Sequence, residues 1–511
     1  MTGQRGCPSA TLCAVRRRLP FLLLAGAAFG VSGVSFTAAR RRRGLGHAVA
    51  TRSRTSRNLE LARLGATVGS SYASTAARKV FASAERRDEL DHEHELKTAD
   101  AVVERLGQMK GALMKLGQMA SYLDEGLPET LRLALAQLQS NAPPMSSELA
   151  EATILAELGQ SPQELFVEWD PVPIAAASIG QVHRALWRDP ATGIEHAVAV
   201  KVQYPGVDRA IESDLSTADF LGTLLKQGFG GLEPEEMVAE IKERLVEELD
   251  YEREARNQRE FAGYYRDHPF IHVPDVVDAL STKRVLTTEL ADGHRFDEVL
   301  TWSQDERDQA AEAIFRFVFR SLYRFHAFNG DPHPGNYVFR KGGQVTFLDF
   351  GLVKHFTDDE MDTFQRMISA AVLEPDPAEY RRVVEGAGML RPDAPVETDE
   401  VGRYFQHFYA PVRDDQEMAW TAAYASSIVR HVFDRSSPIA QYATVPKAFV
   451  FIQRINLGLY AILGQLAAHG NYRRISEEMW PMVNAPASTP MGLAEAEWLR
   501  RSEAGRGLNE G

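Results

Sequence analysis

Three polar residues and the strand pattern between them constrain this chain more than any other feature. Asp331 and Asn336 are five positions apart, and Asn336 and Asp349 are thirteen apart. The intervening segments 337–339 and 345–348 are rich in β-forming residues and are separated by a glycine turn, which predicts a hairpin of two short strands. Such a hairpin would bring Asn336 and Asp349 together at one end. An amide and a carboxylate there suit Mg²⁺, which takes few protein ligands and leaves positions for phosphate and water.

The spacing of these residues is that of the catalytic centre in the protein-kinase fold. In that arrangement Asp331 orients the acceptor hydroxyl or water, while Asn336 and Asp349 hold the metal. An Asp-Phe-Gly triplet or a Pro-Gly-Asn turn is ordinary when it occurs alone. Their combination at this spacing predicts a phosphoryl-transfer site that uses ATP and Mg²⁺.

A kinase also needs a lysine on an upstream sheet, and the segment 196–203 provides one. Its residues alternate, so that Val198, Val200 and Val202 share one face and Lys201 lies on the other. We therefore predict that Lys201 points into a cleft and neutralises phosphate charge. Without the downstream Asp/Asn/Asp set, a surface lysine on an amphipathic strand would be the better interpretation.

The acidic partner of Lys201 should come from a helix, and the segment 235–261 is the best candidate. Asp250 and Glu254 are four positions apart and share one face of that helix. We predict that Glu254 pairs with Lys201. The face argument leaves three other glutamates open as partners, namely Glu247, Glu248 and Glu252.

Two further segments stand out beside this set. Where a kinase has a glycine-rich loop, this chain has an alanine-rich one, which would restrict the loop that covers the nucleotide: Ala175, Ala176, Ala177, Ser178, Ile179 and Gly180. Upstream, an apolar stripe of three- and four-residue steps predicts a packed helix over 99–123. Off this stripe lie Lys115 and Gln118, and the glycines of the helix, Gly117 among them, suggest close approach of another backbone or a ligand.

These motifs together resemble the UbiB family of atypical kinases, the AarF-type proteins. The resemblance runs from about residue 99 to at least 354 and includes Lys-x-Gly-Gln at 115–118, Ala-Ala-Ala-Ser-Ile-Gly-Gln-Val-His at 175–183, Val-Ala-Val-Lys at 198–201, Glu-x-Asp-Tyr-x-Arg-Glu at 248–254, Asp-Pro-His-Pro-Gly-Asn at 331–336 and Leu-Asp-Phe-Gly at 348–351. It implies an α+β fold with the two lobes of a protein kinase and an N-terminal helical extension over the active site.

The resemblance also implies roles for individual residues. Lys115 would occupy the place where a protein substrate docks, held there by Glu248, and the regulatory set would comprise Lys115, Gly117, Gln118, Glu248 and Asp250. Glu254 matches the family partner of the strand lysine, and Glu289 and Leu290 resemble a hinge whose backbone would meet adenine. Family members bind adenine nucleotide with Mg²⁺, show ATPase or restrained kinase behaviour, and support isoprenoid-quinone biosynthesis near a membrane.

The chain departs from the family pattern at two places. Asn329-Gly330 precedes Asp331 where the family more often has His-Ala, which leaves the catalytic residues intact but changes whatever braces their loop. No Ala-Pro-Glu follows Asp349-Phe350-Gly351 at a normal activation-segment distance, so a peptide-docking platform of the protein-kinase kind is unsupported.

The N-terminal segment differs in charge from the rest of the chain. Up to residue 59 it has eleven arginines and no acidic residue, and without them the chain keeps 46 basic residues against 70 acidic ones. The uncharged stretch 19–39 has three interpretations. In the first, it is a single membrane anchor that keeps the body on the cytoplasmic face. In the second, it is part of a mitochondrial or plastid transit peptide. In the third, it belongs to a poorly ordered or wrongly assigned end of a cytoplasmic protein.

The sequence predicts five regions: an Arg-rich segment with a membrane span or targeting peptide (1–59), a helical extension (60–163), a small lobe (164–293), a helical large lobe (294–482) and a disordered tail (483–511). Both cysteines, Cys7 and Cys13, lie in the first region, so no disulfide framework or Cys-based metal site is expected.

The predicted function is that of an ATP-dependent atypical kinase or ATPase that supports quinone or lipid metabolism at a membrane. Its expected partners are adenine nucleotide, a membrane lipid or quinone precursor and quinone-biosynthesis proteins, with no nucleic acid. One alternative is a small-molecule phosphotransferase of the aminoglycoside or choline kinase type, which shares the Asp/Asn/Asp set but gives no account of the Lys-x-Gly-Gln helix. A second is a non-catalytic, nucleotide-gated or lipid-binding scaffold.

Overall fold

The computed structural model describes residues 146–177, 179–207, 249–433, 437–439, 442–444 and 446–507. All of them belong to the unit Gly46–Gly511, and the other unit, Met1–Leu45, lies outside the described residues. The predicted Arg-rich segment, the helix at 99–123 and most of the predicted helical extension therefore fall outside the described part of the chain.

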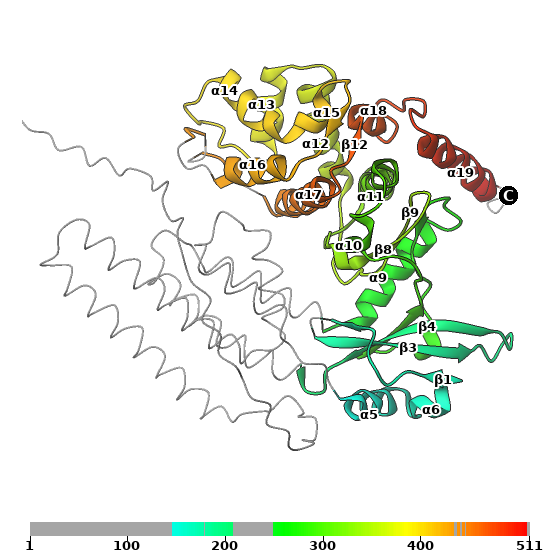
Figure 1. The fold of residues 1–511 in the computed structure, drawn as a ribbon. Coiled ribbons are helices and arrows are strands. Elements are labelled where there is room, and N and C mark those ends of the chain that lie inside the picture. Colours follow the sequence, from blue (N-terminus) through cyan, green and yellow to red (C-terminus); the bar gives the residue numbers. More distant parts are fainter. Residues whose placement is uncertain are drawn as a thin grey trace, which may run out of the picture. The chain divides into compact units, whose positions relative to one another are not determined.

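A five-stranded antiparallel sheet forms the first part of the described chain (Figure 1). Its strands follow the order β1-β3-β4-β6, and β2 pairs with the start of β3. The strands are β1 (Glu168–Trp169), β2 (Ala175–Ala176), β3 (Gly180–Arg188), β4 (Glu195–Gln203) and β6 (Val285–Glu289). In the register of this sheet, Lys201 lies opposite Val182 on one side and Leu286 on the other.

The predicted alternation along β4 is confirmed. Val198, Val200 and Val202 are fully buried in a core that also contains Ala150 and Ile154 of helix α5 (Ser147–Leu158). The short helix α6 (Pro162–Leu165) follows α5, and both lie beside the sheet in Figure 1. The sequence assigned 147–158 to the helical extension, but the apolar side chains of α5 complete the core of the small lobe, which therefore begins before residue 164.

Helix α9 (Tyr251–Tyr264) starts later than the single helix predicted for 235–261. Asp250 has φ −111° and ψ 86°, which is not helical, and its carboxylate accepts a hydrogen bond from the Arg253 backbone N–H at 3.0 Å. Asp is a preferred residue at this capping position. The prediction of one continuous helix through Asp250 is therefore wrong, because this side chain caps a new helix at that point.

The predicted hairpin is confirmed. Strands β8 (Tyr337–Arg340) and β9 (Gln344–Phe347) pair with Tyr337 opposite Phe347, and the turn between them contains two glycines with positive φ, Gly342 and Gly343. β5 (Ile271–His272) pairs in parallel with β9, while β7 (Ala327–Asn329) pairs with β10 (Val353–His355). These short ladders surround the segments that carry Asp331 and Asp349.

The second part of the described chain is mainly helical and has one large apolar core. Its longest helix, α11, begins at a capping box of Ser303 and Glu306 and leads directly into β7. Its helices are α10 (Phe296–Val299), α11 (Gln304–Phe325), α12 (Asp358–Ile368), which continues as the π-helical turn η3 (Ser369–Leu373), α13 (Pro377–Gly386), α14 (Thr398–Gln406), α15 (Ala410–Arg413), α16 (Ala422–Phe433), α17 (Lys447–Gln465), α18 (Tyr472–Glu477) and α19 (Pro490–Gly507). The remaining elements are the 3-10 turns η1 (Asp278–Leu280), η2 (Pro334–Asn336) and η4 (His407–Tyr409) and the paired strands β11 (Met418–Ala419) and β12 (His469–Gly470).

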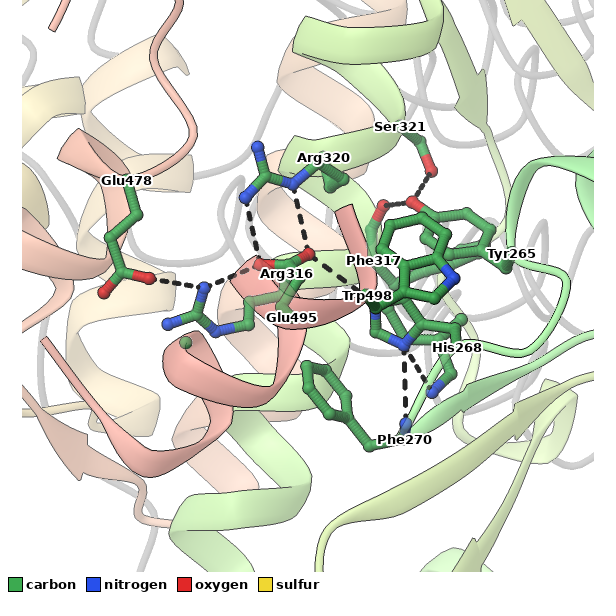
Figure 2. Close-up of polar contacts among 12 residues, drawn as sticks. Tyr265, His268, Phe270, Arg316, Phe317, Arg320, Ser321, Glu478, Glu495 and Trp498 are labelled. Carbon is green, nitrogen blue, oxygen red and sulfur yellow. Dashed lines mark hydrogen bonds and ion pairs between the residues drawn. The ribbon is translucent and has the colours of Figure 1, made fainter. Parts of the chain in front are cut away.

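The predicted disordered tail is wrong for residues 490–507, because they form helix α19 and pack against the large lobe. Glu495 is buried between two arginines of α11, with Arg316 Nη1 at 2.8 Å from Oε2 and Arg320 Nε at 3.1 Å from Oε1 (Figure 2). Arg316 also pairs with Glu478 at 2.8 Å. Trp498 donates from its indole N–H to the Arg266 carbonyl at 2.9 Å. A composition rich in Ala, Gly and Glu concealed these few anchoring residues.

Among the described residues, no helix has both the length and the apolar content needed to cross a bilayer. Helix α17, predicted as a core helix over 449–466, contributes fully buried residues such as Ile455, Leu459 and Leu463 to the large core.

Candidate functional site

Lys201 lies at the centre of the candidate site and contacts two acidic residues from distant parts of the chain. Its Nζ is 2.7 Å from Oε1 and 2.9 Å from Oε2 of Glu254 on α9, and 3.7 Å from Oδ2 of Asp349. Glu254 is buried, whereas the Lys201 side chain keeps 19% of its surface exposed and Asp349 keeps 33%. Of the glutamates that sequence reasoning left open, the structure places Glu254 on Lys201.

The charge of Lys201 is secured by these neighbours. Burial alone would favour the neutral amine, but the carboxylates of Glu254 and Asp349 outweigh it and raise the pKa of Lys201 well above its ordinary value. The ammonium also lies 5.0 Å from the centre of the Tyr251 ring. Lys201 is therefore a permanent positive charge beside Asp349, as binding of nucleotide phosphates requires.

Asn329 joins the loops that carry the two aspartates. Its side-chain amide donates to the Asp349 carbonyl at 2.7 Å, and its amide oxygen accepts a long hydrogen bond of 3.4 Å from the Asp331 backbone N–H. The next residue, Gly330, donates from its backbone to Leu352 O at 2.7 Å, and a Cβ there would lie 2.8 Å from Leu352 Cγ. The two residues that depart from the family pattern, Asn329 and Gly330, therefore hold the Asp331 and Asp349 segments together through their own hydrogen bonds.

Asn336 faces Asp331 rather than standing alone. Its amide nitrogen lies 3.1 Å from the Asp331 backbone oxygen and 3.5 Å from Asp331 Oδ2. The hairpin closes next to it, since Leu348 donates to Asn336 O at 2.9 Å, which places Asn336 beside the segment that leads into Asp349. The structure therefore brings Asp331, Asn336 and Asp349 to one end of the hairpin, as the spacing predicted.

The donor set fits a nucleotide-associated Mg²⁺. The amide nitrogen of Asn336 donates to Asp331, so the amide oxygen is the atom that could bind a cation. The second ligand is the partly exposed carboxylate of Asp349, whose Oδ1 also accepts a hydrogen bond from Gly351 N at 3.0 Å. Within the described ranges, no group of three or more His, Cys, Asp or Glu residues could hold a metal by itself. Two oxygen ligands nevertheless suffice for Mg²⁺ when phosphate and water complete its shell.

Asn257 is a residue of the site that sequence reasoning missed. From α9, three positions after Glu254, its side chain donates to the Phe350 carbonyl at 2.8 Å. Phe350 itself is fully buried against Phe261, with ring centres 5.0 Å apart. One helix thus holds both Lys201 and the Asp349-Phe350-Gly351 segment. The i, i+3 spacing of Glu254 and Asn257 was the available signal.

The alanine-rich segment forms a hairpin rather than an open loop. Ala175 and Ala176 are exposed and pair with Val182 and Gln181, and Ala177 donates to Gly180 O at 2.9 Å. Ser178 lies outside the described residues. Ile179 is buried, and a Cβ at Gly180 would collide with the Val202 carbonyl oxygen, so the Gly at 180 is required by close packing of β3 on β4.

The proposed adenine hinge has its backbone N–H groups already engaged. Glu289 N donates to Asp275 O at 2.9 Å, and Leu290 N donates to Ala197 O at 3.0 Å. The Glu289 carboxylate accepts from His272 at 3.0 Å, an interaction that lowers the pKa of Glu289. Contacts of these two residues with adenine would therefore come from their carbonyl groups or side chains.

The structure describes only one of the five residues in the regulatory set. Lys115, Gly117, Gln118 and Glu248 lie outside the described residues. Asp250 is described, and it acts as the N-cap of α9 and lies 3.9 Å from Arg256. Its role in the structure is to start the helix that carries Glu254.

The antiparallel sheet with its paired lysine, together with the Asp/Asn/Asp set at the end of a hairpin, defines an α+β protein-kinase-like fold. Residues 137–384 match the model of the ABC1 atypical kinase-like domain. The chain belongs to this family of UbiB-type atypical kinases.

Similar proteins agree with this assignment. The chain is 36% identical over 278 residues to the mitochondrial atypical kinase COQ8B of Rattus norvegicus, covering 53% of this chain and 51% of the relative. It is 30% identical over 288 residues to the mitochondrial atypical kinase COQ8 of Saccharomyces cerevisiae, with 56% of each chain covered. The chain thus spans about half the length of these curated relatives. Among solved structures, Rv3197 of Mycobacterium tuberculosis, in complex with erythromycin, matches with a TM-score of 0.56 and 30% identity, covering 78% of this chain and all of that one.

Proposed function

We propose that this chain is an ATP-dependent atypical kinase or ATPase. The observation that carries the proposal is the contact set of Lys201, which lies 2.7 Å from Glu254 and 3.7 Å from Asp349. In an active kinase the lysine on the sheet must pair with a helical glutamate while the metal-binding aspartate stands nearby. Three segments that are distant in sequence supply these residues, so the arrangement is a property of the fold.

Each residue of the site has its own role in phosphoryl transfer. Lys201 binds the nucleotide phosphates and is held in place by Glu254. Asp331 is buried at the base of the site and orients the acceptor hydroxyl or water, while Asn336 and Asp349 hold the Mg²⁺ that neutralises phosphate charge when bound. Asn329 and Asn257 fix the position of the Asp349-Phe350-Gly351 segment by donating hydrogen bonds to the Asp349 and Phe350 carbonyls. Ala175 to Gly180 and the hinge at Glu289 and Leu290 contribute to nucleotide binding.

We further propose that the enzyme supports isoprenoid-quinone or lipid metabolism at a membrane, with a membrane lipid or quinone precursor and quinone-biosynthesis proteins as partners. Relatives named as mitochondrial and, in Arabidopsis thaliana, as chloroplastic support an organellar location for this activity. In this proposal Lys115, Gln118 and Glu248 restrain access of peptide substrates. Residues 1–59 supply either a single membrane anchor or a targeting peptide for a mitochondrion or plastid.

The test separates nucleotide binding from turnover. Asp349→Asn should abolish the Mg²⁺-dependent stabilisation by ATP in a thermal-shift titration, because it removes the charged metal ligand while leaving the shape of the side chain. Asp331→Asn should keep that stabilisation and lose ATP turnover by at least a hundredfold, since the buried carboxylate acts only on the acceptor.

Turnover should be measured with the purified full chain, with and without membrane vesicles, quinone-precursor mimics and candidate proteins. Unchanged Mg-ATP affinity in Asp349→Asn would remove the assigned metal site. Full cellular function in Asp331→Asn, together with loss of function when nucleotide binding is lost, would identify a nucleotide-gated scaffold instead of an enzyme.

A further inference from the structure

Helix α19 contacts three separate parts of the fold that lead to the candidate site. Its Met491 side chain packs on the turn between β8 and β9, since a Cβ at Gly343 would lie 3.1 Å from Met491 Cε. Its Glu495 pairs with the two buried arginines of α11 (Figure 2). Its Trp498 donates to the Arg266 carbonyl just after the end of α9. One C-terminal helix therefore joins the hairpin, α11 and α9, each of which leads to residues of the site.

The end of α9 is held by both α11 and α19. The Tyr265 hydroxyl donates to the Phe317 carbonyl at 3.0 Å and lies 2.6 Å from Ser321 Oγ, both on α11. From α19, the Trp498 ring stacks on Tyr265 with ring centres 6.2 Å apart, and its N–H donates to the Arg266 carbonyl at 2.9 Å. Tyr265 and Trp498 are 3% and 4% exposed, so water has little access to these contacts. The last turn of α9 therefore has a fixed position.

The first turns of the same helix carry contacts of the candidate site. Glu254 holds Lys201 at 2.7 Å, and Asn257 donates to the Phe350 carbonyl at 2.8 Å. Tyr265 is eleven positions after Glu254, which is about 17 Å along a helix. A packed helix of this length moves as one rigid element, so a shift of its last turn also moves Glu254. In the kinase fold, the position of this helix decides whether the lysine–glutamate pair forms.

We propose that α19 controls the position of the catalytic lysine: Trp498, acting through α9, holds Glu254 at Lys201. Trp498 is thus a positioning residue and not a catalytic one. The inference rests on the proposed phosphoryl transfer and adds to it a dependence on the C-terminal helix. If α19 only stabilised the large lobe, its loss would affect α9 no more than an equal loss of stability elsewhere in the lobe.

The first measurement is amide hydrogen exchange in the full-length protein, which needs no turnover. Trp498→Phe keeps a stacked ring and removes the N–H donor, whereas Trp498→Ala removes both. In Trp498→Ala the amides of residues 251–258 should exchange about tenfold faster than in wild type, with a smaller increase in Trp498→Phe. The same two substitutions at Trp420, an equally buried tryptophan of the large core, are the matched controls and should leave exchange in this segment unchanged.

The second measurement is ATP turnover in a double-mutant cycle with Glu254→Gln. Trp498→Ala should lower kcat about tenfold in the otherwise wild-type chain. In the Glu254→Gln background it should lower kcat no more than about twofold, because the pair through which Trp498 acts is already broken. A purely structural role of Trp498 would instead give the same loss in both backgrounds.

Unchanged exchange at residues 251–258 in both Trp498 variants, or an equal increase in the Trp420 controls, would overturn the inference even if wild type turns over ATP. Equal losses of kcat in the two backgrounds would overturn it as well. A wild-type chain without ATP turnover would count against the proposed function, and hydrogen exchange alone would then decide whether α19 fixes α9. If Trp498→Ala fails to fold, as judged by circular dichroism, Trp498→Phe and Trp420→Phe serve for both measurements.

Discussion

Asn329 shows how much of this site depends on one uncharged side chain. It contacts the backbone of Asp349, twenty positions away, and of Asp331, two positions away, and is itself buried. The sequence indicated an altered brace at this position but not its partner, because a hydrogen bond across twenty residues leaves no local pattern. Once the hairpin brings Asp349 back to β7, Asn329 is the residue within reach.

Asn329→Ala should lower ATP turnover about tenfold or more. The change removes the hydrogen bond to the part-buried Asp349 carbonyl, which costs about 0.5–1.5 kcal/mol, and it loosens the loop that positions the catalytic carboxylates. Steady-state kcat and Mg-ATP affinity are the measurements. Asn471→Ala, at the half-buried N-cap of α18 and outside the candidate site, is the control and should turn over like wild type. Full activity in Asn329→Ala would show that Asn329 is not the brace.

Ala176→Gly tests the restraint attributed to the alanine-rich segment. Ala176 pairs with Gln181 and is exposed, so the substitution removes no buried contact, and the greater freedom of Gly costs only about 0.5–1 kcal/mol. We expect an altered ratio of ATP to ADP affinity and raised autophosphorylation, measured by nucleotide titration and phosphate incorporation. A lower melting temperature with wild-type nucleotide behaviour would mean that the alanines only pack.

At the scale of single elements, short-range patterns predicted well and long-range ones did not. The alternation along β4 and the glycine turn between β8 and β9 are local, and both are confirmed. The start of α9 was missed because the charged periodicity continues through Asp250, although the Asp itself is a preferred cap. Helix α19 was missed because its contacts with the lobe come from a few scattered residues. Glu495 and Trp498 make the polar contacts, and Met491 and Leu499 pack beside the large core.

Glu495→Ala should lower the free energy of unfolding by about 3–5 kcal/mol. The substitution leaves Arg316 and Arg320 buried without their shared carboxylate, and removal of one partner from a buried charge pair is costly. Chemical denaturation measures the change. Glu497→Ala, two positions along the same helix, removes an exposed ion pair with Arg500 and should cost no more than about 1 kcal/mol. Equal losses in the two variants would contradict a special role for the buried pair.

At the scale of the whole molecule, α19 connects the end of the described chain to the small-lobe side of the site. Its Trp498 and Glu495 contact the turn after α9, at Arg266 and His268, and that turn leads into β5, which pairs with β9 just before Asp349. The same α9 holds Lys201 at its other end through Glu254. The residues of the site thus depend on a packed frame that runs from α9 to the C-terminal helix, and titration of its buried groups should affect the stability of the fold.

His268 makes the stability of this frame dependent on pH. Its ring is buried, its Nδ1 accepts hydrogen bonds from the backbone N–H groups of Phe270 and Ile271, and its Nε2 lies 3.7 Å from Glu495, too far for a hydrogen bond (Figure 2). Burial lowers the pKa of His268 below its ordinary value. Burial alone would raise the pKa of Glu495, but Arg320, His268 and Arg316 together hold it far below the usual range.

Both groups bind fewer protons in the folded chain than in the unfolded chain, so both make stability decrease as the pH falls. The contribution of His268 is complete above the unfolded pKa of about 6.5 and is lost as the pH falls from there towards the lowered folded value; that of Glu495 is lost only below about 4.3. We therefore expect the free energy of unfolding, measured in urea, to decrease between pH 7.5 and pH 5. His268→Asn keeps an acceptor for the two backbone N–H groups and removes the titrating ring, so the stability of this variant should change less over this pH range. The control is His196→Asn, at an exposed position, which should follow wild type. Parallel curves for wild type and His268→Asn would exclude His268 as the source of the dependence.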